Sequence, residues 1–442
     1  MCILALDLGT TAFKCAPVSE ERLLAPPATA RYALDYRDGQ VTFDPEAYFR
    51  IAMQALGRAS AAARAAGEPV SAIGVSSQAQ TYIPLDAAGR PLHPAVVWTD
   101  VRAGAEADEV ARAIPDFARH SGFRRPQAEL FLPKVMHFVR HAGIPLRRVW
   151  KFLLLNEYIL YRLTGRAYGD ETNQGMSGFY DIAERRVSQA ALDLAGLNAG
   201  QLAQIAPAAG IGHTLDSARA AELGLEPVPL YSCGNDQSAA AAGAGLSAEG
   251  DVLCNFGTAM VVYALQDELP AALRDRQIAG INPLTGRYFV LGSEPECGNV
   301  LDWARAMFYR DRAFESMLAE ALGGEVDPSR LPAVEWRGGG TLDLARLSLA
   351  SEPKHVVRAL LERYAGIFGE LLEGMTVPSR AMRLFASGGL SRSEAWLEFL
   401  ERRHAIAFTR AGADQPGLAG IARIIRAAQA QAGRRASGPS EG

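Results

Sequence analysis

The stretch LALDLGTTAFK, residues 4–14, decides the fold. Its apolar run stops at Asp7, and a Gly-Thr-Thr turn and Lys14 follow. The pattern predicts a strand over 3–8 that ends in a tight turn and leads into a second strand. An acid followed by small residues with hydroxyl groups is suited to holding a polar ligand.

A second stretch repeats this pattern in the other half of the chain. VLCNFGTAMVV, residues 252–262, again gives a strand, a D/N-x-G-T turn and a further strand. Two such turns that face each other can clamp a polyphosphate, because backbone N–H groups and Thr hydroxyls match its anionic oxygens. The second turn has Asn255 where the first has Asp7. A carboxylate does not bind phosphate directly, so we expect Asp7 to act through a divalent metal and its waters.

Length and composition indicate a soluble globular protein of two domains. The chain has 442 residues, which is more than one ordinary core accommodates. Hydrophobic residues make up 49% and charged residues 21%. The net charge of -4, without a polybasic patch, argues against a nucleic-acid partner.

Cysteine usage and the apolar segments indicate the compartment. The five cysteines are far apart and form no Cys-x-x-Cys pair, which is typical of reduced thiols in the cytosol. The sequence opens on a strand pattern, and no apolar run approaches the roughly 18 residues of a membrane span. We therefore expect a cytoplasmic protein without a membrane partner.

Predicted strands and helices alternate along most of the chain, which favours α/β domains. In doubly wound sheets ligands bind at the C-terminal ends of the strands, and several predicted strands end in polar residues. A change of pattern near residue 245 suggests an N-terminal domain at 1–245 and a C-terminal domain at 246–430. The polar residues 431–442 are predicted to be a disordered tail.

Several residues have a plainer interpretation. Asp236 suits the N-cap of a helix. His137 and His141 are four residues apart, but HFVRH lacks the glutamate of a zinc-protease helix, so a packed or solvated helix face is expected. Trp98 and Trp303 are expected to be packing residues.

Taken together, the motifs resemble those of the FGGY family of carbohydrate kinases, which share the actin/hexokinase-like ATPase fold. The resemblance implies two ribonuclease-H-like domains with a cleft between them. The segments that carry it are, in chain order, DLGTT, WTDVR, LFLPKVMHFVRH, GDETNQGMSGFYD, GNDQSAA, NFGTA, GNVLDW and SGGLSRSEAW.

The resemblance also implies roles for individual residues. Asp236 would be the general base that takes a proton from the attacking sugar hydroxyl. Asp7 would hold Mg²⁺ through water, with Asp236 near the same ion. The ATP contacts implied are Gly9, Thr10, Thr11, Lys14, Gly257 and Thr258 for the phosphates and Gly388, Gly389, Arg392 and Ser393 for the adenosine. The acceptor contacts implied are Gln78, Ala79, Gln80, Asp100, Glu129 and Gln237.

The sequence departs from the family pattern in two places. The segment at 330–354 is short and lacks the Gly-Glu-Arg and Gly-Leu elements usual there. Ala79 and Gln80 occupy the position that reads Met-His in xylulose kinases and Arg-Glu in glycerol kinases, so glycerol is the less favoured acceptor.

The function expected is therefore the ATP-dependent phosphorylation of a hydroxyl group on a small sugar, a ketose or a polyol. One alternative is a sugar or nucleotide sensor of the same fold that has lost turnover, which the short 330–354 segment suggests. A second is an ATPase that acts on partner proteins, although only a short tail follows residue 428. A homodimer is left open.

Overall fold

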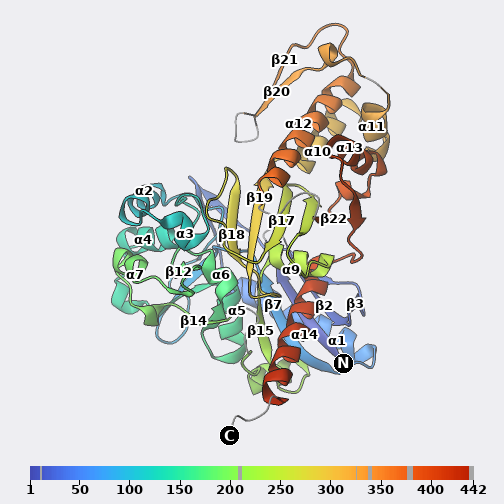
Figure 1. Ribbon diagram of the computed structural model, residues 1–442. Helices are drawn as coiled ribbons and strands as arrows, with labels where there is room; N and C mark the ends of the chain where they lie inside the picture. The colour runs from blue at the N-terminus through green and yellow to red at the C-terminus, as the bar shows by residue number, and fades with distance from the viewer. Residues whose placement is uncertain (10–11, 208–211, 325, 337–340, 376–381, 438–442) are drawn as a thin grey trace.

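The computed structural model describes residues 1–9, 12–207, 212–324, 326–336, 341–375 and 382–437. Two mixed sheets form its frame, the first below the second in Figure 1. The first has the order β15-β7-β1-β2-β3, with β4 paired to β2. Its strands are β1 (Cys2–Leu8), β2 (Phe13–Ser19), β3 (Arg22–Leu23), β4 (Ala28–Ala30), β7 (Val70–Ser77) and β15 (Leu230–Asn235).

The second sheet has the order β18-β19-β17-β16-β22-β23. In each sheet an antiparallel hairpin, β1–β2 or β16–β17, is extended by strands parallel to its first member. The repeat seen in the sequence is thus a repeat of topology, and the predicted α/β fold of two ribonuclease-H-like sheets is confirmed. The strands are β16 (Asp251–Phe256), β17 (Met260–Gln266), β18 (Gln277–Ile281), β19 (Tyr288–Glu294), β22 (Arg383–Ser387) and β23 (Phe408–Arg410).

A third, smaller sheet and a group of helices extend the first half of the chain. The sheet has the order β10-β8-β9-β6-β5, and its strands are β5 (Asp35–Arg37), β6 (Gln40–Phe43), β8 (Tyr82–Leu85), β9 (Ala95–Val96) and β10 (Lys151–Leu154). Short pairs join β11 (Tyr168–Asp170) to β14 (Gln204–Ala206) and β12 (Tyr180–Asp181) to β13 (Arg186–Val187). The helices are α1 (Pro45–Ala65), α2 (Gly104–Ala113), α3 (Phe117–Ser121), α4 (Phe131–His141), α5 (Leu155–Thr164), α6 (Glu171–Gly175), α7 (Gln189–Ala195) and α8 (Ser217–Leu223).

Local signals in the sequence account for several element ends. The Asp44 side chain accepts hydrogen bonds from the N–H groups of Glu46 and Ala47, and Pro45 opens α1, as predicted. Gly165 ends α5 in the left-handed conformation, also as predicted.

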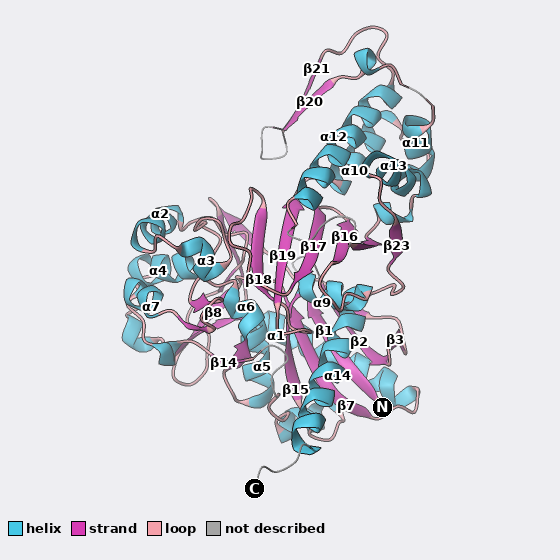
Figure 2. Ribbon diagram, in the orientation of Figure 1, coloured by secondary structure: helices cyan, strands magenta, loops and turns pink. Residues whose placement is uncertain are grey.

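The second half adds helices at the outer end of its sheet, as Figure 2 shows. They are α10 (Gly298–Phe308), α11 (Phe314–Leu322), α12 (Pro353–Glu373) and α13 (Glu394–His404). The short 330–354 segment contains a hairpin of β20 (Ala333–Trp336) and β21 (Leu342–Ala345) that precedes α12. Among the described residues, no helix combines the length and the apolar character that a membrane crossing requires.

The last helix, α14 (Pro416–Ser437), returns to the first sheet. It packs against α9 (Asp236–Ala244), and its Leu418, Ile421 and Ile425 share an apolar cluster with Ile3 of β1. Because α14 continues through residue 437, the prediction of a disordered tail is wrong for 431–437; residues 438–442 lie outside the described part. The domain limits at 245 and 430 stay predictions. Helix α14 belongs to the second half of the chain but packs against α9 and β1 of the first half.

A second link between the two halves lies at α3. The N–H of Ala279 in β18 donates to the carbonyl of Gly122 (2.7 Å), and Phe123 forms a β-bridge with Ile278. The halves are therefore joined both by helix packing and by main-chain hydrogen bonds.

Close contact between α9 and α14 depends on glycine. A Cβ atom on Gly420 would lie 1.8 Å from the carbonyl oxygen of Ala239, and one on Gly243 would lie 1.8 Å from that of Pro416. Side chains here would force the helices apart.

We expect Gly420→Ala to lower the free energy of unfolding by about 1–3 kcal/mol, because the added methyl group overpacks the contact. Gly366→Ala, in α12 where a Cβ meets nothing within 4 Å, is the matched control. Helix propensity should make it stabilising by about 0.5–1 kcal/mol. Urea unfolding of both variants measures the difference; equal effects would contradict the role given to Gly420.

Candidate functional site

The C-terminal ends of three parallel strands bring the acidic residues together. Asp7 of β1 is in register with Ser76 of β7, and Ser77 is in register with Asn235 of β15. A register irregularity between Ser232 and Asn235, with Gly234 at φ +74°, turns the end of β15 toward α9. Asp236 then follows as the first residue of that helix.

Asp236 is not the helix cap, which corrects the plainer interpretation. The Asn235 side chain caps α9 by accepting from the N–H of Ser238 (2.8 Å). Asp236 Oδ1 accepts from the N–H of Gln237 (2.9 Å). Its carboxylate is therefore held in place at a helix N-terminus without being needed as the cap.

The two carboxylates influence each other. Burial, and to a smaller extent the nearby Asp236 carboxylate, raise the pKa of Asp7 to about 7, while Lys14 opposes the shift. Burial also raises the pKa of Asp236, to about 6, against hydrogen bonds from the backbone. A pair of close, poorly solvated carboxylates is a position that favours a bound cation.

Buried oxygens without partners gather around this pair. Among the described residues, Asp7 Oδ1, Gln78 Oε1 and Gln237 Oε1 are buried and make no hydrogen bond. Gln78 Nε2 is held by the hydroxyl of Tyr32 (3.3 Å), so its oxygen is left free. Buried acceptors are normally satisfied, so water or a ligand is expected to complete these groups. The carboxylate oxygen fits Mg²⁺ and its waters, and the amide oxygens can accept hydrogen bonds from hydroxyl groups.

The first phosphate turn lies beside this edge, although Thr10 and Thr11 are outside the described residues. A Cβ on Gly9 would come within 2.8 Å of the Ala12 carbonyl oxygen, so a larger residue would be crowded here. Lys14 Nζ donates to Gln415 Oε1 (2.9 Å) in the loop before α14. The lysine is thereby anchored near the carboxylates.

The start of α14 belongs to the site, which the sequence reasoning missed. A Cβ on Gly417 would lie 2.7 Å from Asp7 Oδ2, so the helix N-terminus approaches the carboxylate directly. The positive end of the helix dipole favours negative charge there. The available signal was DQPGLAG at 414–420, in which Pro416 stands at the first helical position.

The second phosphate turn is braced by α10. The carbonyl of Thr258 accepts from the N–H groups of Cys297 (3.0 Å) and Gly298 (3.0 Å), and the Gly257 N–H closes the turn on Ala259 (3.0 Å). The Thr258 side chain is exposed. Its hydroxyl is therefore open to a ligand.

The predicted adenosine turn follows β22. Gly388 has φ +89°, and a Cβ there would lie 2.5 Å from the Phe256 carbonyl carbon, so glycine is required. A Cβ on Gly389 would meet nothing within 4 Å, and Arg392 is exposed. Ser393 differs: it is buried, caps α13 and donates to Glu315 Oε1 (2.9 Å), so its hydroxyl is already used.

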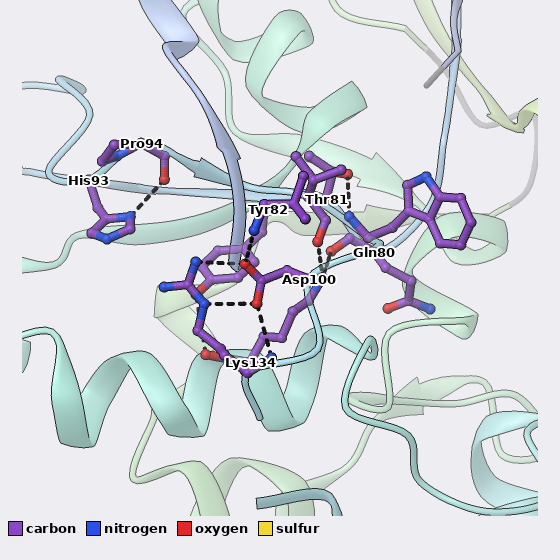
Figure 3. A network of polar contacts seen from close by, with 11 residues as sticks. Gln80, Thr81, Tyr82, His93, Pro94, Asp100 and Lys134 are labelled. Atoms are coloured by element: carbon purple, nitrogen blue, oxygen red, sulfur yellow. Dashed lines mark hydrogen bonds and ion pairs between the residues drawn. The ribbon is translucent and has the colours of Figure 1, made fainter. Parts of the chain in front are cut away.

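A buried lysine fixes the backbone on the predicted acceptor side (Figure 3). Lys134 Nζ donates to the carbonyls of Gln80 (3.0 Å) and Val97 (2.8 Å). The Gln80 side chain bonds to the main chain of Phe131 and Met176. Lys134 and Gln80 therefore connect the turn after β7 to α4 and to the residue that follows β9 through hydrogen bonds.

Asp100 is a structural residue in this arrangement. It is completely buried, and its Oδ2 accepts from the N–H of Val41 (2.7 Å) and Nη2 of Arg102 (2.6 Å). Its Oδ1 accepts from Nε (2.8 Å) and N (3.2 Å) of Arg102. These four hydrogen bonds occupy both oxygens of the carboxylate, so Asp100 is not available to bind the hydroxyl groups of a substrate.

The remaining predicted acceptor residues are more open. Ala79, Glu129 and Gln237 are half-buried. Trp98 is 40% exposed, and its backbone N–H donates to Thr81 Oγ1 (3.1 Å).

Comparison with known proteins supports the resemblance to carbohydrate kinases along most of the chain. Residues 2–243 match the model of the FGGY family of carbohydrate kinases, N-terminal domain. Xylulose kinase of Bacillus subtilis (strain 168) is 22% identical over 408 residues, covering 90% of this chain and 82% of that one. Glycerol kinase of Rhodospirillum rubrum is 27% identical over 98% of this chain and 92% of its own.

Solved structures agree in fold. The crystal structure of a "xyloylose kinase" from Brucella ovis superposes with a TM-score of 0.87 at 23% identity, covering 97% of this chain and 91% of that chain. The likeness extends the two-lobed fold to the second half of the chain, beyond the residues that the family model matches.

Lys134 generates a prediction for stability. Burial lowers the pKa of Lys134 to about 7, whereas lysine in an unfolded chain titrates near 10.4. Between these values the unfolded chain binds a proton that the folded chain does not, so the free energy of unfolding rises with pH. Relative to Lys134→Met, the wild type should gain about 1.4 kcal/mol per pH unit in this window. Urea unfolding at several pH values measures it, and parallel pH curves would contradict the assignment.

Proposed function

We propose, because the chain belongs to the FGGY family of carbohydrate kinases, that it transfers the terminal phosphoryl group of ATP to a hydroxyl group of a small sugar, a ketose or a polyol. The observation that carries the proposal is the pairing of Asp7 and Asp236 at the strand ends, with unpartnered oxygens around them. This arrangement supplies both a base and a place for a cation.

Asp236 is the general base of the proposed reaction. Its pKa of about 6 leaves it ionised at neutral pH and basic enough to accept a proton. The acceptor hydroxyl gives its proton to the Asp236 carboxylate as its oxygen bonds to phosphorus, and the bond from phosphorus to the ADP oxygen breaks. Placement at the start of α9 fixes the direction of the carboxylate.

Asp7 and Asp236 would hold Mg²⁺, Asp7 through water. When bound, the ion neutralises phosphate charge and orients the terminal phosphoryl group. Lys14, fixed by Gln415, adds a positive charge beside the same edge. Gly417 leaves room for the helix N-terminus to approach, which further favours anionic oxygens.

The nucleotide contacts proposed are those that the geometry leaves open. The phosphates would be bound by the turns at Gly9 and Lys14 and at Gly257 and Thr258, with Thr10 and Thr11 carried over from the sequence alone. Adenosine would lie against Gly388 and Gly389, near Arg392. Ser393 is left out because its hydroxyl is used by the helix cap and Glu315.

The acceptor contacts proposed are neutral for the most part. Gln78 and Gln237 each offer a free amide oxygen, and Ala79 and Glu129 belong to the same predicted wall. The Gln80 side chain, bonded to the main chain of Phe131 and Met176, would contribute to that wall by its position only. Amide groups bind sugar hydroxyls without a matching charge, which supports an uncharged polyol or ketose. Asp100 is left out because all its bonds are internal.

All five cysteines are free and buried. Reduced thiols support a reducing compartment, and we place the proposed activity in the cytoplasm. We further propose no nucleic-acid partner, given the net charge of -4, and leave a homodimer as an open proposal.

We expect Asp236→Asn to lower sugar-dependent ADP release by about 10²–10⁴-fold, the usual contribution of a general base. ATP binding, measured by calorimetry, should survive because Asp7, Lys14 and the two phosphate turns are unchanged and the amide keeps the size of the side chain. The assay is coupled ADP release across a panel of ketoses, polyols and aldoses.

The same panel separates the alternatives. Sugar-stimulated release by the wild type supports the kinase, binding without release supports a sensor, and sugar-independent release supports an ATPase. Normal turnover by Asp236→Asn would overturn the assignment of the base.

A further inference from the structure

A group of metal-ligating side chains lies between α2 and α4, apart from the site described above. The two helices pack side by side at the outer end of the first half (Figures 1 and 2). Glu106 comes from α2, and His137 and His141 come from successive turns of α4. Within the described part of the chain, this is the one group of three or more His, Cys, Asp or Glu residues whose ligand atoms all lie within 4.8 Å of one another.

The two helices bring the three side chains to one point. Histidines four residues apart project from the same face of a helix. Glu106 is buried, with 3% of the residue exposed, on the face of α2 that meets α4. The third ligand comes from 31 residues earlier in the chain, which the local HFVRH pattern could not reveal.

The spacing of the ligand atoms suits a tetrahedral ion. Nδ1 of His137 lies 3.3 Å from Oε2 of Glu106, and Nε2 of His141 lies 3.3 Å from Oε1. Both contacts are within hydrogen-bonding distance, and each uses a different oxygen of the Glu106 carboxylate. Bonds of about 2.0–2.2 Å to zinc place neighbouring tetrahedral ligand atoms about 3.3 Å apart. One ligand atom from each of the three side chains lies within 4.8 Å of the other two, which is close enough for all three to converge on a single ion.

We propose that Glu106, His137 and His141 bind one Zn²⁺ ion between α2 and α4. Two imidazoles and a carboxylate are ligands that zinc accepts, and two histidines with one glutamate occur together in known zinc sites. A negative ligand with only 3% exposure also needs a compensating charge, which the ion supplies.

A cavity of about 360 Å³ lies beside the two histidines. His137, His141, His93, Arg102 and Lys134 contribute to its lining. Arg102 is neutralised by Asp100, and Lys134 is bonded to two carbonyls, so neither cation is directed at the ion. Water has room to complete the tetrahedron.

The ion has a structural consequence for the acceptor side. α2 begins two residues after Arg102, and α4 carries Lys134, which fixes Gln80 and Val97. A zinc ion that joins α2 to α4 would therefore fix the positions of Arg102 and Lys134 relative to each other on the predicted acceptor side. Zinc binding itself does not depend on the proposed kinase activity.

The test is calorimetric titration of the chelator-treated full chain with ZnCl₂ in excess MgCl₂. We expect one Zn²⁺ per chain, and His137→Ala, His141→Ala or Glu106→Gln should each weaken its binding at least about tenfold, by analogy with other losses around zinc sites. His93→Ala, which alters the same cavity, and Asp7→Asn, which alters the other carboxylate pair, should both keep it.

Substitution with Co²⁺ gives a second readout. Tetrahedral Co²⁺ absorbs strongly in the visible range, and this absorption should appear with the wild type and with His93→Ala but not with His137→Ala. No bound zinc, unchanged binding in the double variant His137→Ala/His141→Ala, or loss of zinc in Asp7→Asn would each overturn the proposal.

Discussion

Electrostatic repulsion between Asp7 and Asp236 is the constraint on which the rest of the site depends. Both carboxylates are poorly solvated and close enough for Asp236 to raise the pKa of Asp7. Lys14 only partly offsets this, and one oxygen of Asp7 has no partner. Such a pair costs stability in the free protein, which is typical of sites that bind a cation.

The fold maintains this pair through contacts that tolerate little change. Parallel pairing sets the ends of β1, β7 and β15 at one edge. Glycines let α14 lie against α9, so that its first turn reaches Asp7 although more than 400 residues separate them. The second turn is braced in a comparable way by α10. The site is thus assembled from both halves of the chain, which accounts for the repeat that defines them.

Much of the fold could be predicted from the sequence because its signals are local. The apolar run ending at Asp7, the cap at Asp44 and the repeat at Asn255 each depend on a few neighbouring residues. The partners of side chains depend on distant packing. Nothing near Asp100 indicates that the N–H of Val41, 59 residues earlier, would bond to one of its oxygens.

Two further residues show the same limit. Ser393 was predicted to bind nucleotide, but packing of α11 brings Glu315 to its hydroxyl. Gly417 was not predicted at all, since its role exists only once α14 has returned to the first sheet. The central claim, that Asp7 and Asp236 form a cation-dependent nucleotide site, is tested most directly by calorimetric titration with ATP, with and without Mg²⁺. Mg²⁺ should tighten ATP binding to the wild type and have little effect on Asp7→Asn; an equal Mg²⁺ dependence in both proteins would contradict the account.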